Sequence, residues 1–540
     1  MHIVVDRRPS GVALIEDDGS HVVVAPQNLA SAIRERELEH PRWVWTDTAQ
    51  WYPALLAAGV RVERCHDLKL VDALVAAIEG HPARRGWGSA PAPRRTDTLF
   101  ELDSEVDAEP TVSATEAWAH QRAAIAASPH PARLTLLAAA ESAGALTAVE
   151  MQFAGLPWSV DAHDALLTEL LGPRPAAGVR PAQLDVLARQ VEALLGVGPV
   201  PIDSPPALVS ALRRAGIDVA TTRSSELKRV DHQAIEPLLH YKSLSRLHTA
   251  NGWNWLDEWV HDGRFRPTFV PGGVVTGRWA SDGGGALQLP RQVRSAVQAD
   301  DGWALVVADA AQLEPRILAA LSGDAAMARA GAGVDLYAGI VESGAVPSRE
   351  HAKVGMLGAM YGGTTGVSAQ VLPRLARSFP QAIGFVETAA RAGERGERVS
   401  TRLGRTSPAP SRSWRDRQEV AAVDGAAESD ARAARSAARS WGRFTRNFVV
   451  QGTAAEWALA WMAGVRRRLW VADGTPLTAQ PHLVFFVHDE LIVHSPRDRV
   501  DDVRTALIDA AADAGRIIFG DTPVSFPVTV AAVQRYSDAK

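Results

Sequence analysis

The sequence has little cysteine and no long apolar run. Its single cysteine, Cys65, cannot form an intrachain disulfide, and a zinc site built on cysteine ligands is excluded. No stretch approaches the roughly 18 apolar residues that a membrane span needs, and the N-terminal MHIVVDRRPSG has no long apolar stretch. We therefore expect a cytoplasmic protein with no membrane partner.

The sequence also lacks the basic excess that is typical of nucleic-acid-binding proteins. Its formal net charge is −5 and its pI is about 6.4. The arginines are nevertheless uneven, because residues 391–446 contain thirteen arginines against seven acidic residues, a local balance of +6. A local groove matters more than bulk charge for a polyanionic partner, although a solvated helical face explains the same pattern.

At 540 residues the chain is too long for one hydrophobic core, so two to four structural units are expected. The first hundred residues alternate short β-rich runs with helical patterns, as a small α/β unit does. A Pro- and Arg-rich stretch, residues 81–98, is typical of a linker. Residues 406–440 contain few large apolar side chains, which predicts a mobile insertion with a helical second half.

Two strand-like segments end in carboxylates. HLVFFVHDELIVHSP, residues 482–496, predicts a hairpin whose polar turn contains Asp489 and Glu490 but no glycine, and the run WALVVADA places Asp309 at its end. If the strands are neighbours in one sheet, Asp309 and Asp489 face each other as like charges and need a divalent cation between them.

The type of ligand indicates the cation and the chemistry. Carboxylate oxygens without cysteine favour Mg²⁺ or Mn²⁺. Two carboxylates that grip two ions about 3.5 to 4 Å apart suit in-line displacement at phosphorus. The pair therefore predicts phosphoryl transfer.

The segment VPSREHAKVGMLGAMYGG predicts a helix that begins after Pro347, with Ser348 as its N-cap. Arg349, Lys353, Leu357 and Tyr361 then follow at steps of four and lie along one face. Two cations, an apolar side chain and a tyrosine in this order could hold a triphosphate at one end and a base at the other. An ordinary amphipathic helix with solvated basic ends is the alternative.

These segments resemble motifs A, B and C of family A DNA polymerases, the bacterial DNA polymerase I class. DAAQLEPR resembles motif A, REHAKVGMLGAMYGG motif B and VHDE motif C. TGRWAS, LQLP, RFTRNFVVQGTAAE and LHYKSLSRL resemble further conserved segments, and the resemblance covers about residues 145–540.

The resemblance implies an α/β multidomain fold. A right-hand polymerase, with an antiparallel-sheet palm and helical fingers and thumb, would follow a small RNase H-like exonuclease domain. The boundaries that we expect are as follows: exonuclease-like domain 1–110, linker helices 111–145, thumb and connecting helices 146–265, palm 266–330, fingers 331–445 with the Arg-rich insertion 406–440, and palm again 446–540.

The resemblance also implies roles for individual residues. Asp309 and Asp489 would be the metal ligands, and with Glu490 nearby would form the catalytic set around two Mg²⁺ ions, or Mn²⁺. The nucleotide-binding residues would be Gln312, Glu314, Tyr337, Arg349, Lys353, Leu357 and Tyr361. The residues that bind primer and template, mainly through phosphates and minor-groove acceptors, would be Lys242, Arg246, Arg278, Gln288, Arg443, Asn447, Gln451 and His488. For His488, an ordinary turn histidine is the alternative.

The expected function is template-directed addition of deoxynucleotides to a primer 3′-hydroxyl, in replication or repair, by a bacterial, nucleoid-associated monomer. The partners would be primer-template DNA and deoxynucleoside triphosphates. Glu314 would lie against the sugar's C2′ edge and exclude a 2′-hydroxyl. A protein that binds primer-template DNA but has lost useful turnover is the alternative, although it would need neither a cation site nor a sugar gate.

Several positions depart from the family pattern. Ala310 and Ala311 stand where motif A usually has Tyr and Ser, and Pro315 replaces a leucine. Leu357 replaces the aromatic residue of motif B, and Tyr337 a phosphate-binding histidine. We expect a working but slower polymerase with altered sugar discrimination.

The N-terminal unit lacks the carboxylate pattern of the family's 3′-5′ exonuclease. Its first strand reads VVDRRPS instead of containing Asp-x-Glu, the second motif region offers Thr46 with Trp51 or Tyr52, and the third motif has no match. Without those carboxylates two metal ions cannot be held. We expect this unit to be an inactive remnant of the exonuclease domain. The missing carboxylates also argue against the alternative that the protein is an exonuclease whose polymerase part is inactive.

Overall fold

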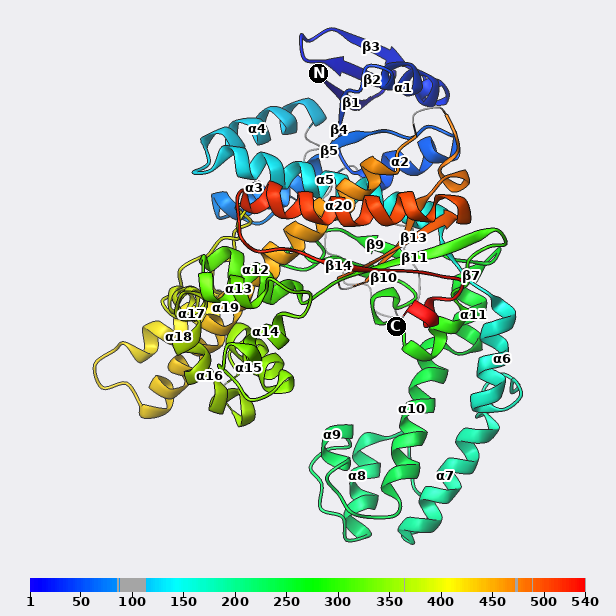
Figure 1. Cartoon of the computed structure of the whole chain (residues 1–540), viewed down its shortest axis with the longest axis vertical. Coiled ribbons are helices and arrows are strands. Elements are labelled where there is room, and N and C mark those ends of the chain that lie inside the picture. Colours follow the sequence, from blue (N-terminus) through cyan, green and yellow to red (C-terminus); the bar gives the residue numbers. More distant parts are fainter. Residues whose placement is uncertain (85–86, 88–112, 364, 472–473, 488, 540) are drawn as a thin grey trace. The chain divides into compact units, whose positions relative to one another are not determined.

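The computed structural model describes residues 1–84, 87, 113–363, 365–471, 474–487 and 489–539 (Figure 1). Most of the expected linker at 81–98 lies outside these residues, as does His488. The chain divides into two compact units: the first contains Met1–Ala154, Thr268–Asp282 and Val306–Ala532, and the second contains Gly155–Pro267, Gly283–Leu305 and Val533–Lys540. The expected domain boundaries at 145/146 and 445/446 fall inside helices α5 (Pro131–Ala154) and α19 (Glu428–Arg468).

The N-terminal part of the first unit is a small α/β fold, as the sequence predicts. Its sheet has the order β3-β2-β1-β4-β5, in which β1 runs antiparallel to β2 and parallel to β4. Trp43, Trp45 and Tyr52 are fully buried in its core. The elements are β1 (His2–Arg8), β2 (Gly11–Glu16), β3 (His21–Val24), a 3-10 turn (Pro26–Asn28), α1 (Leu29–Glu37), β4 (Arg42–Trp45), α2 (Thr48–Ala57), β5 (Arg64–Asp67) and α3 (Leu68–Glu79).

Two helices follow, α4 (Ala114–Ala127) and α5 (Pro131–Ala154). Among the described residues, α5 alone is long and apolar enough to cross a membrane, a stretch that the sequence analysis did not single out. Of its most apolar window, 78% is buried inside the protein, as in a core helix. It also carries two buried acids, Glu141 and Glu150.

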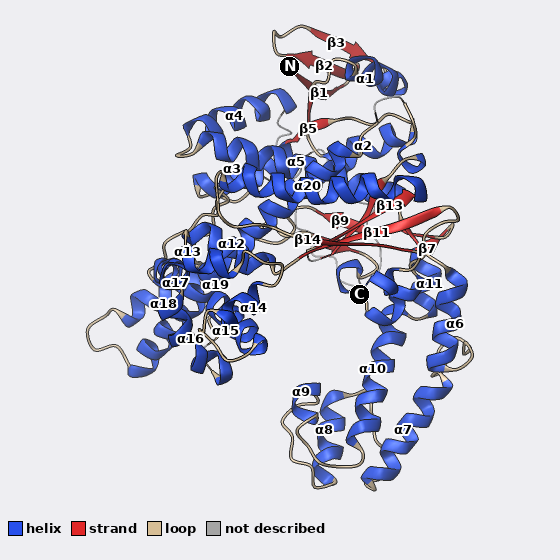
Figure 2. Cartoon of the chain, in the orientation of Figure 1, coloured by secondary structure: helices blue, strands red, loops and turns tan. Residues whose placement is uncertain are grey.

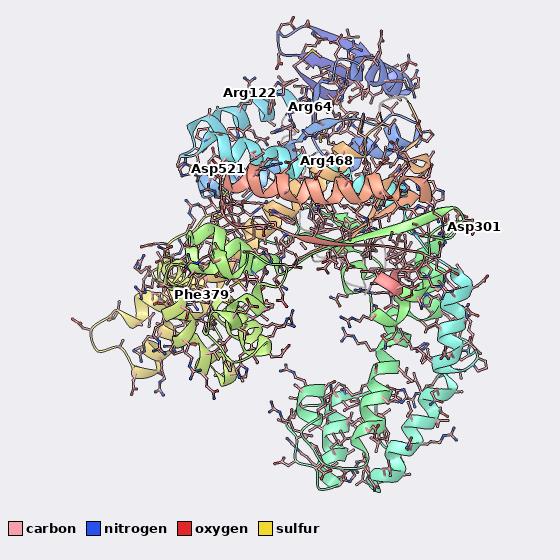
Figure 3. The ribbon with its side chains drawn as sticks, viewed as in Figure 1. Arg64, Arg122, Asp301, Phe379, Arg468 and Asp521 are labelled. Atoms are coloured by element: carbon pink, nitrogen blue, oxygen red, sulfur yellow. The ribbon has the colours of Figure 1, made fainter. Side chains whose placement is uncertain are left out.

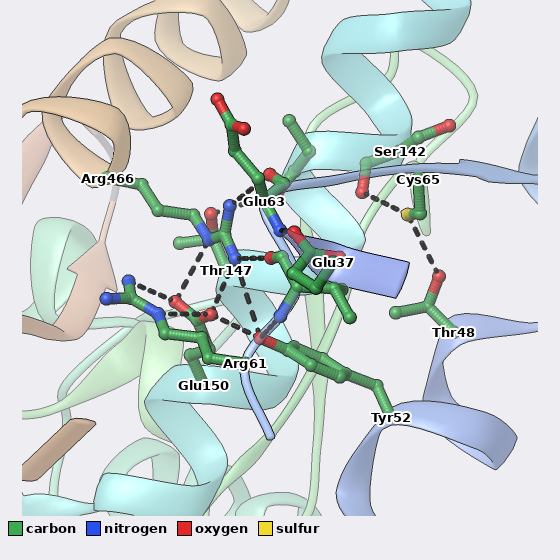
Figure 4. A network of polar contacts seen from close by, with 12 residues as sticks. Glu37, Thr48, Tyr52, Arg61, Glu63, Cys65, Ser142, Thr147, Glu150 and Arg466 are labelled. Atoms are coloured by element: carbon green, nitrogen blue, oxygen red, sulfur yellow. Dashed lines mark hydrogen bonds and ion pairs between the residues drawn. The ribbon is translucent and has the colours of Figure 1, made fainter. Parts of the chain in front are cut away.

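A buried ion cluster joins the N-terminal fold to α5 and α19 (Figure 4). Glu150 of α5 accepts hydrogen bonds from the Tyr52 hydroxyl at 2.6 Å, from Arg61 at 2.9 and 3.0 Å, and from Arg466 at 2.7 and 3.0 Å. Arg466 also donates to the backbone carbonyl of Glu63 at 2.6 Å. Burial alone would raise the pKa of Glu150, but the Arg466 and Arg61 guanidiniums hold it well below its usual range.

The central sheet of the first unit has the order β12-β13-β11-β14 (Figure 2). β11 (Trp303–Ala310), β12 (His482–Val487), β13 (Glu490–Pro496) and β14 (Val528–Val533) form it, and a separate ribbon pairs β9 (Thr268–Val270) with β10 (Ala280–Asp282). The predicted hairpin is confirmed, since β12 and β13 pair antiparallel. Glu490, which the sequence analysis placed in the turn, lies opposite Val487 and begins β13. β13 and β11, the strands next to Asp489 and Asp309, are neighbours in this sheet, as expected.

Helices cover this sheet and extend away from it. They are α12 (Leu313–Ser322), α13 (Ala325–Ala330), α14 (Leu336–Glu342), α15 (Arg349–Tyr361), α16 (Gly366–Ser378), α17 (Pro380–Glu394), α18 (Arg412–Ala421), α19 (Glu428–Arg468) and α20 (Val500–Phe519), with 3-10 turns at Leu477–Ala479 and Arg497–Arg499. Phe379, labelled in Figure 3, is buried where α16 meets α17. The 406–440 segment is helical in both halves, whereas the sequence predicted only its second half.

The second unit is mainly helical, as expected for residues up to about 265. Its helices are α6 (Val160–Leu171), α7 (Ala182–Leu195), α8 (Pro205–Arg214), α9 (Ser224–Leu227), α10 (Ile235–Asn251) and α11 (Trp253–Trp259). A small sheet in the order β6-β8-β7 contains β6 (Leu156–Pro157), β7 (Val260–His261) and β8 (Arg264–Phe265). Three 3-10 helices complete it, at Ala286–Gln288, Arg291–Ala296 and Tyr536–Ala539.

Candidate active site

The two aspartates lie at neighbouring positions of the central sheet. Asp309 is the penultimate residue of β11 and Asp489 directly precedes β13, the adjacent strand. The Ala310 N–H donates to the Asp489 carbonyl at 2.9 Å, which ties the two segments together. The carboxylates that the sequence places 180 residues apart are therefore brought to one edge of the sheet.

The electrostatics of the pair show that the two carboxylates interact. Burial raises the pKa of Asp489 to about 6; the Arg278 charge opposes this rise, and the Glu314 and Asp309 charges add to it. A raised pKa means that the ionised form is disfavoured when no counter-ion is present. A divalent cation would reverse that balance, since it favours the charged form of both carboxylates.

The donor set fits a hard cation. Two aspartates supply oxygen ligands, which suit Mg²⁺ or Mn²⁺, and Glu490 is buried at the start of β13 next to Asp489. Within the described ranges no group of three or more His, Cys, Asp or Glu side chains is arranged around one point as a ready-made metal site. The two aspartates would thus leave coordination positions for water or substrate oxygens, as is usual for Mg²⁺ in sites that handle phosphates.

Glu314 is held by two other predicted site residues. It lies in the first turn of α12, is only 8% exposed, and forms an ion pair with Arg278. The Tyr361 hydroxyl donates to its two carboxylate oxygens at 2.7 and 3.0 Å. Burial, with the Glu314 charge second, raises the pKa of Tyr361 to about 12. Glu314 is therefore a buried acid whose carboxylate is fixed by an ion pair and by hydrogen bonds.

The predicted helix over motif B is confirmed. α15 begins at Arg349, and the Ser348 hydroxyl caps it by accepting from the His351 N–H. Along the predicted face, Arg349 and Lys353 are exposed, and Leu357 is half-buried. Both cations are therefore accessible to solvent, although Arg349 is paired with Asp335.

A second chain of contacts links motif A to this helix. The Gln312 amide donates to Asp335 Oδ1 at 3.3 Å, and Arg349 donates to Asp335 Oδ2 at 2.7 Å. The Arg349 guanidinium also lies 5.6 Å from the centre of the Tyr337 ring. Gln312, Tyr337 and Arg349, all predicted nucleotide-binding residues, are therefore brought together by Asp335.

Asp335 is a central residue that the sequence analysis did not assign to the site. Its Oδ1 also accepts from the backbone N–H groups of Tyr337 and Ala338, which makes it the N-cap of α14. The Arg349 guanidinium and the accepted backbone bonds outweigh the effect of burial and lower the pKa of this carboxyl. The signal that could have found it is an aspartate directly before a helical pattern, a common capping arrangement.

Three predicted DNA-binding residues share α19. Arg443 is exposed, while Asn447 and Gln451 are half-buried on following turns. The Thr276 hydroxyl donates to Gln451 at 3.0 Å and fixes the amide. Gly362, in the left-handed region with φ 75°, ends α15 so close to Arg443 that a Cβ would lie 2.6 Å from its Cγ. Glycine is required there on both grounds.

Three further predicted DNA-binding residues, Lys242, Arg246 and Gln288, lie in the second unit. Arg246 and Gln288 line one cavity of about 410 Å³ between α10 and the loop that precedes the 3-10 helix at Ala286. Lys242 does not join them, because its amine donates to the Thr222 carbonyl at 2.6 Å. Burial lowers the pKa of Lys242. Arg246 and Gln288 thus face the same cavity, whereas Lys242 is used in a structural contact with Thr222.

Residues at the expected nuclease positions make structural contacts. Asp6 accepts from the Ala114 N–H at 3.3 Å, and Arg8 stands 3.9 Å from Asp6 where the family pattern has its second acid. Thr46 accepts from the Trp51 indole at 3.0 Å.

Comparisons with known proteins identify the family. The sequence profile of DNA polymerase family A matches residues 182–534, and the chain belongs to this family. The resemblance found in the sequence is therefore confirmed.

Individual relatives are distant in sequence. The thermostable DNA polymerase I of Thermus filiformis is 29% identical over 333 residues, which cover 56% of this chain and 36% of that protein. DNA polymerase I of Chloroflexus aurantiacus is 26% identical over 336 residues, covering 57% of this chain and 33% of that protein. The match thus spans about a third of the length of these relatives.

A solved structure has the same fold over nearly the whole chain. The POL domain of Pol1 from M. smegmatis, in complex with DNA primer-template and dNTP, matches with a TM-score of 0.70 and 20% sequence identity. The match covers 99% of this chain and 95% of that one. The predicted fold class, a right-hand polymerase preceded by a small α/β domain, is confirmed.

Proposed function

We propose that this protein is a template-directed DNA polymerase that adds deoxynucleotides to a primer 3′-hydroxyl. The observation that carries the proposal is the convergence of Asp309 and Asp489 at adjacent strand ends in a chain of DNA polymerase family A. Asp309 and Asp489 would hold two Mg²⁺ ions, and metal ions bound there would supply activation of the 3′-hydroxyl and charge stabilisation of the leaving pyrophosphate.

The side chains around the aspartates would bind and orient the nucleotide. Arg349 and Lys353, both exposed on one face of α15, would pair with the triphosphate. Glu314, fixed by Arg278 and Tyr361, would stand against the sugar and exclude a 2′-hydroxyl. Arg443, Asn447 and Gln451 would contact primer and template without reading sequence.

The N-terminal domain would be a structural element without nuclease activity. Its first strand carries Arg8 where a second acid would be needed, and Asp6 already accepts a backbone hydrogen bond. The buried Glu150 cluster supports a structural role, since it joins this domain to α5 and α19. Incubation with a mismatched primer end tests this: metal-dependent excision that survives Asp309→Ala would overturn it.

Primer extension with Mg²⁺ tests the polymerase proposal. Wild-type protein should extend a primer with deoxynucleotides and not with ribonucleotides, and Asp489→Ala should abolish extension. Tight primer-template binding by wild-type protein without any extension would instead support the binding-only alternative.

We also propose that the protein works as a monomer in the bacterial cytoplasm, associated with the nucleoid, in replication or repair. Sizing of the purified protein tests the first point, because a mass near 57.7 kDa is expected. A mass twice as large at micromolar concentration would refute it.

A further inference from the structure

The arginines of residues 391–446 divide into two groups in the structure. One group has structural partners. Arg395 pairs with Glu397, Arg405 with Glu141 and Arg446 with Glu387. Arg398 and Arg402 donate to the backbone carbonyls of Ala77 and Ile518. These five positive charges are used within the fold.

A second group forms a line along α19, which we call the α19 arginine row: Arg432, Arg435, Arg439 and Arg443. All four are exposed. Steps of three and four residues keep them on one side of the helix. The buried residues Ala434 and Thr445 of the same turns lie on the other side of the helix. The row spans twelve residues, or about 16 Å along the helix.

The row is not neutralised by nearby acids. No acidic residue occurs from 431 to 446, a stretch with five arginines. Glu428 pairs weakly with Arg432 at 3.8 Å, while Arg443 donates to the Ser440 hydroxyl at 2.9 Å. Within the described residues, no carboxylate lies within ion-pair distance of Arg435, Arg439 or Arg443. An ordinary solvated helix face would carry mixed charges.

The hairpin before the row adds further exposed helix. α18 lies beside the N-terminal part of α19 (Figure 1), and none of its residues is buried. The Gln418 amide donates to the Ala434 carbonyl at 3.0 Å and holds the two helices together. The acids Glu428 and Asp430 stand at the N-terminal end of α19, before the row. Positive charge therefore increases along the helix towards Arg443.

We propose that the α19 arginine row binds the phosphate backbone of DNA and lengthens the DNA contact of Arg443, Asn447 and Gln451 by about three helical turns. The ligand would be a nucleic-acid backbone because the row is continuous with those residues on one helix and carries charge of one sign. Arginine suits this role, since its fork of donors matches phosphate oxygens. The inference rests on the proposed polymerase function.

The salt dependence of DNA binding tests the inference. The double variant Arg435→Gln, Arg439→Gln removes two positive charges from exposed positions. Each lost phosphate contact should reduce the slope of log K against log[salt] by about 0.9, so the slope should fall by roughly 1.8. Fluorescence anisotropy with a labelled primer-template between low and moderate salt measures this.

A matched control removes the same charge elsewhere. Arg34→Gln, Arg122→Gln changes one exposed arginine of α1 and one of α4, both outside the row, and should keep the wild-type slope. If the α19 double variant has the same slope of log K against log[salt] as the control, the inference is overturned. The row would then be a candidate binding surface for an acidic protein. The proposed function is tested separately: failure of the wild-type protein to extend a primer would refute it, whatever the salt dependence of DNA binding.

Discussion

At the scale of single residues, Arg316 shows how a motif residue can act through the backbone. It is fully buried in α12 and has no carboxylate partner within the described residues. Its guanidinium donates at 2.6 to 3.1 Å to the backbone carbonyls of Ala311, Gly331, Gly333, Val334 and Ser525. One side chain thereby fixes the segment after Asp309 and the loop before α14.

Replacing Arg316 with methionine should destabilise the protein by about 3 to 5 kcal/mol, because several buried carbonyls would lose their donors together. Arg329→Met, at an exposed arginine of the neighbouring α13, should change the free energy of unfolding by less than about 0.5 kcal/mol. Urea unfolding of both variants checks this. Equal midpoints for the two variants would contradict the structural role.

Leu357 is a second residue at which a substitution should have a measurable effect, here on the rate of nucleotide incorporation. It is half-buried on the face of α15 that carries Lys353 and Tyr361, where the family has an aromatic side chain. Leu357→Phe should raise the single-turnover rate of nucleotide incorporation about 2- to 10-fold, since aromatic contacts contribute roughly 0.5 to 1.5 kcal/mol. Val367→Phe, an exposed position on α16, serves as the control. An unchanged Leu357→Phe rate would count against nucleotide stacking there.

At the scale of elements, the sequence predicts regular segments well and their tertiary contacts poorly. The β12–β13 hairpin and the start of α15 at Ser348 follow from strand patterning and capping, which are local. Arg466 with Glu150, or Arg405 with Glu141, could not be predicted, because the partners lie 316 and 264 residues apart. The aspartate pair could be inferred only because strand-end carboxylates and the family resemblance coincide.

Glu456 on α19 is one such unpredicted contact. It is fully buried, accepts from the Thr401 hydroxyl and from the Leu403 N–H, the latter at 3.0 Å, and holds the 400–406 turn against the helix. Burial raises its pKa to about 7 despite these hydrogen bonds. The folded state then binds more protons than the unfolded state between about pH 4.5 and 7, so this group lowers stability as pH rises through that window.

Glu456→Gln should remove that pH dependence and keep the packing. The stability of the variant relative to wild type, measured as the difference in their free energies of unfolding, should be roughly 3 kcal/mol greater at pH 8 than at pH 4.5. Denaturant unfolding of both proteins at the two pH values checks this. A difference between the proteins that is the same at both pH values would show that Glu456 does not titrate in this range.

At the scale of the first compact unit, the Glu150 cluster couples the N-terminal fold to the polymerase helices. Arg466 donates hydrogen bonds to Glu150 and to the Val62 and Glu63 carbonyls. Two residues after it, Arg468, labelled in Figure 3, forms an ion pair with Asp513 of α20. A domain fixed by a buried ion cluster should unfold together with the rest of its unit.

Arg466→Met should cost about 3 to 5 kcal/mol, because Glu150 would remain buried with less positive charge. Arg467→Met, at the adjacent exposed position, should cost less than about 0.5 kcal/mol. Thermal unfolding by calorimetry measures both. A separate early transition in Arg466→Met would show that the N-terminal fold has been uncoupled, whereas a wild-type profile would contradict the joining role.

The most direct measurement is single-turnover primer extension with Mg²⁺ by wild-type protein, Asp309→Asn and Asp489→Asn, each with its primer-template affinity. If the two aspartates share metal ions, each variant should bind DNA as wild type does, and its single-turnover extension rate should fall at least about a thousand-fold. Extension by either variant at a rate within ten-fold of wild type would contradict a common metal site at Asp309 and Asp489.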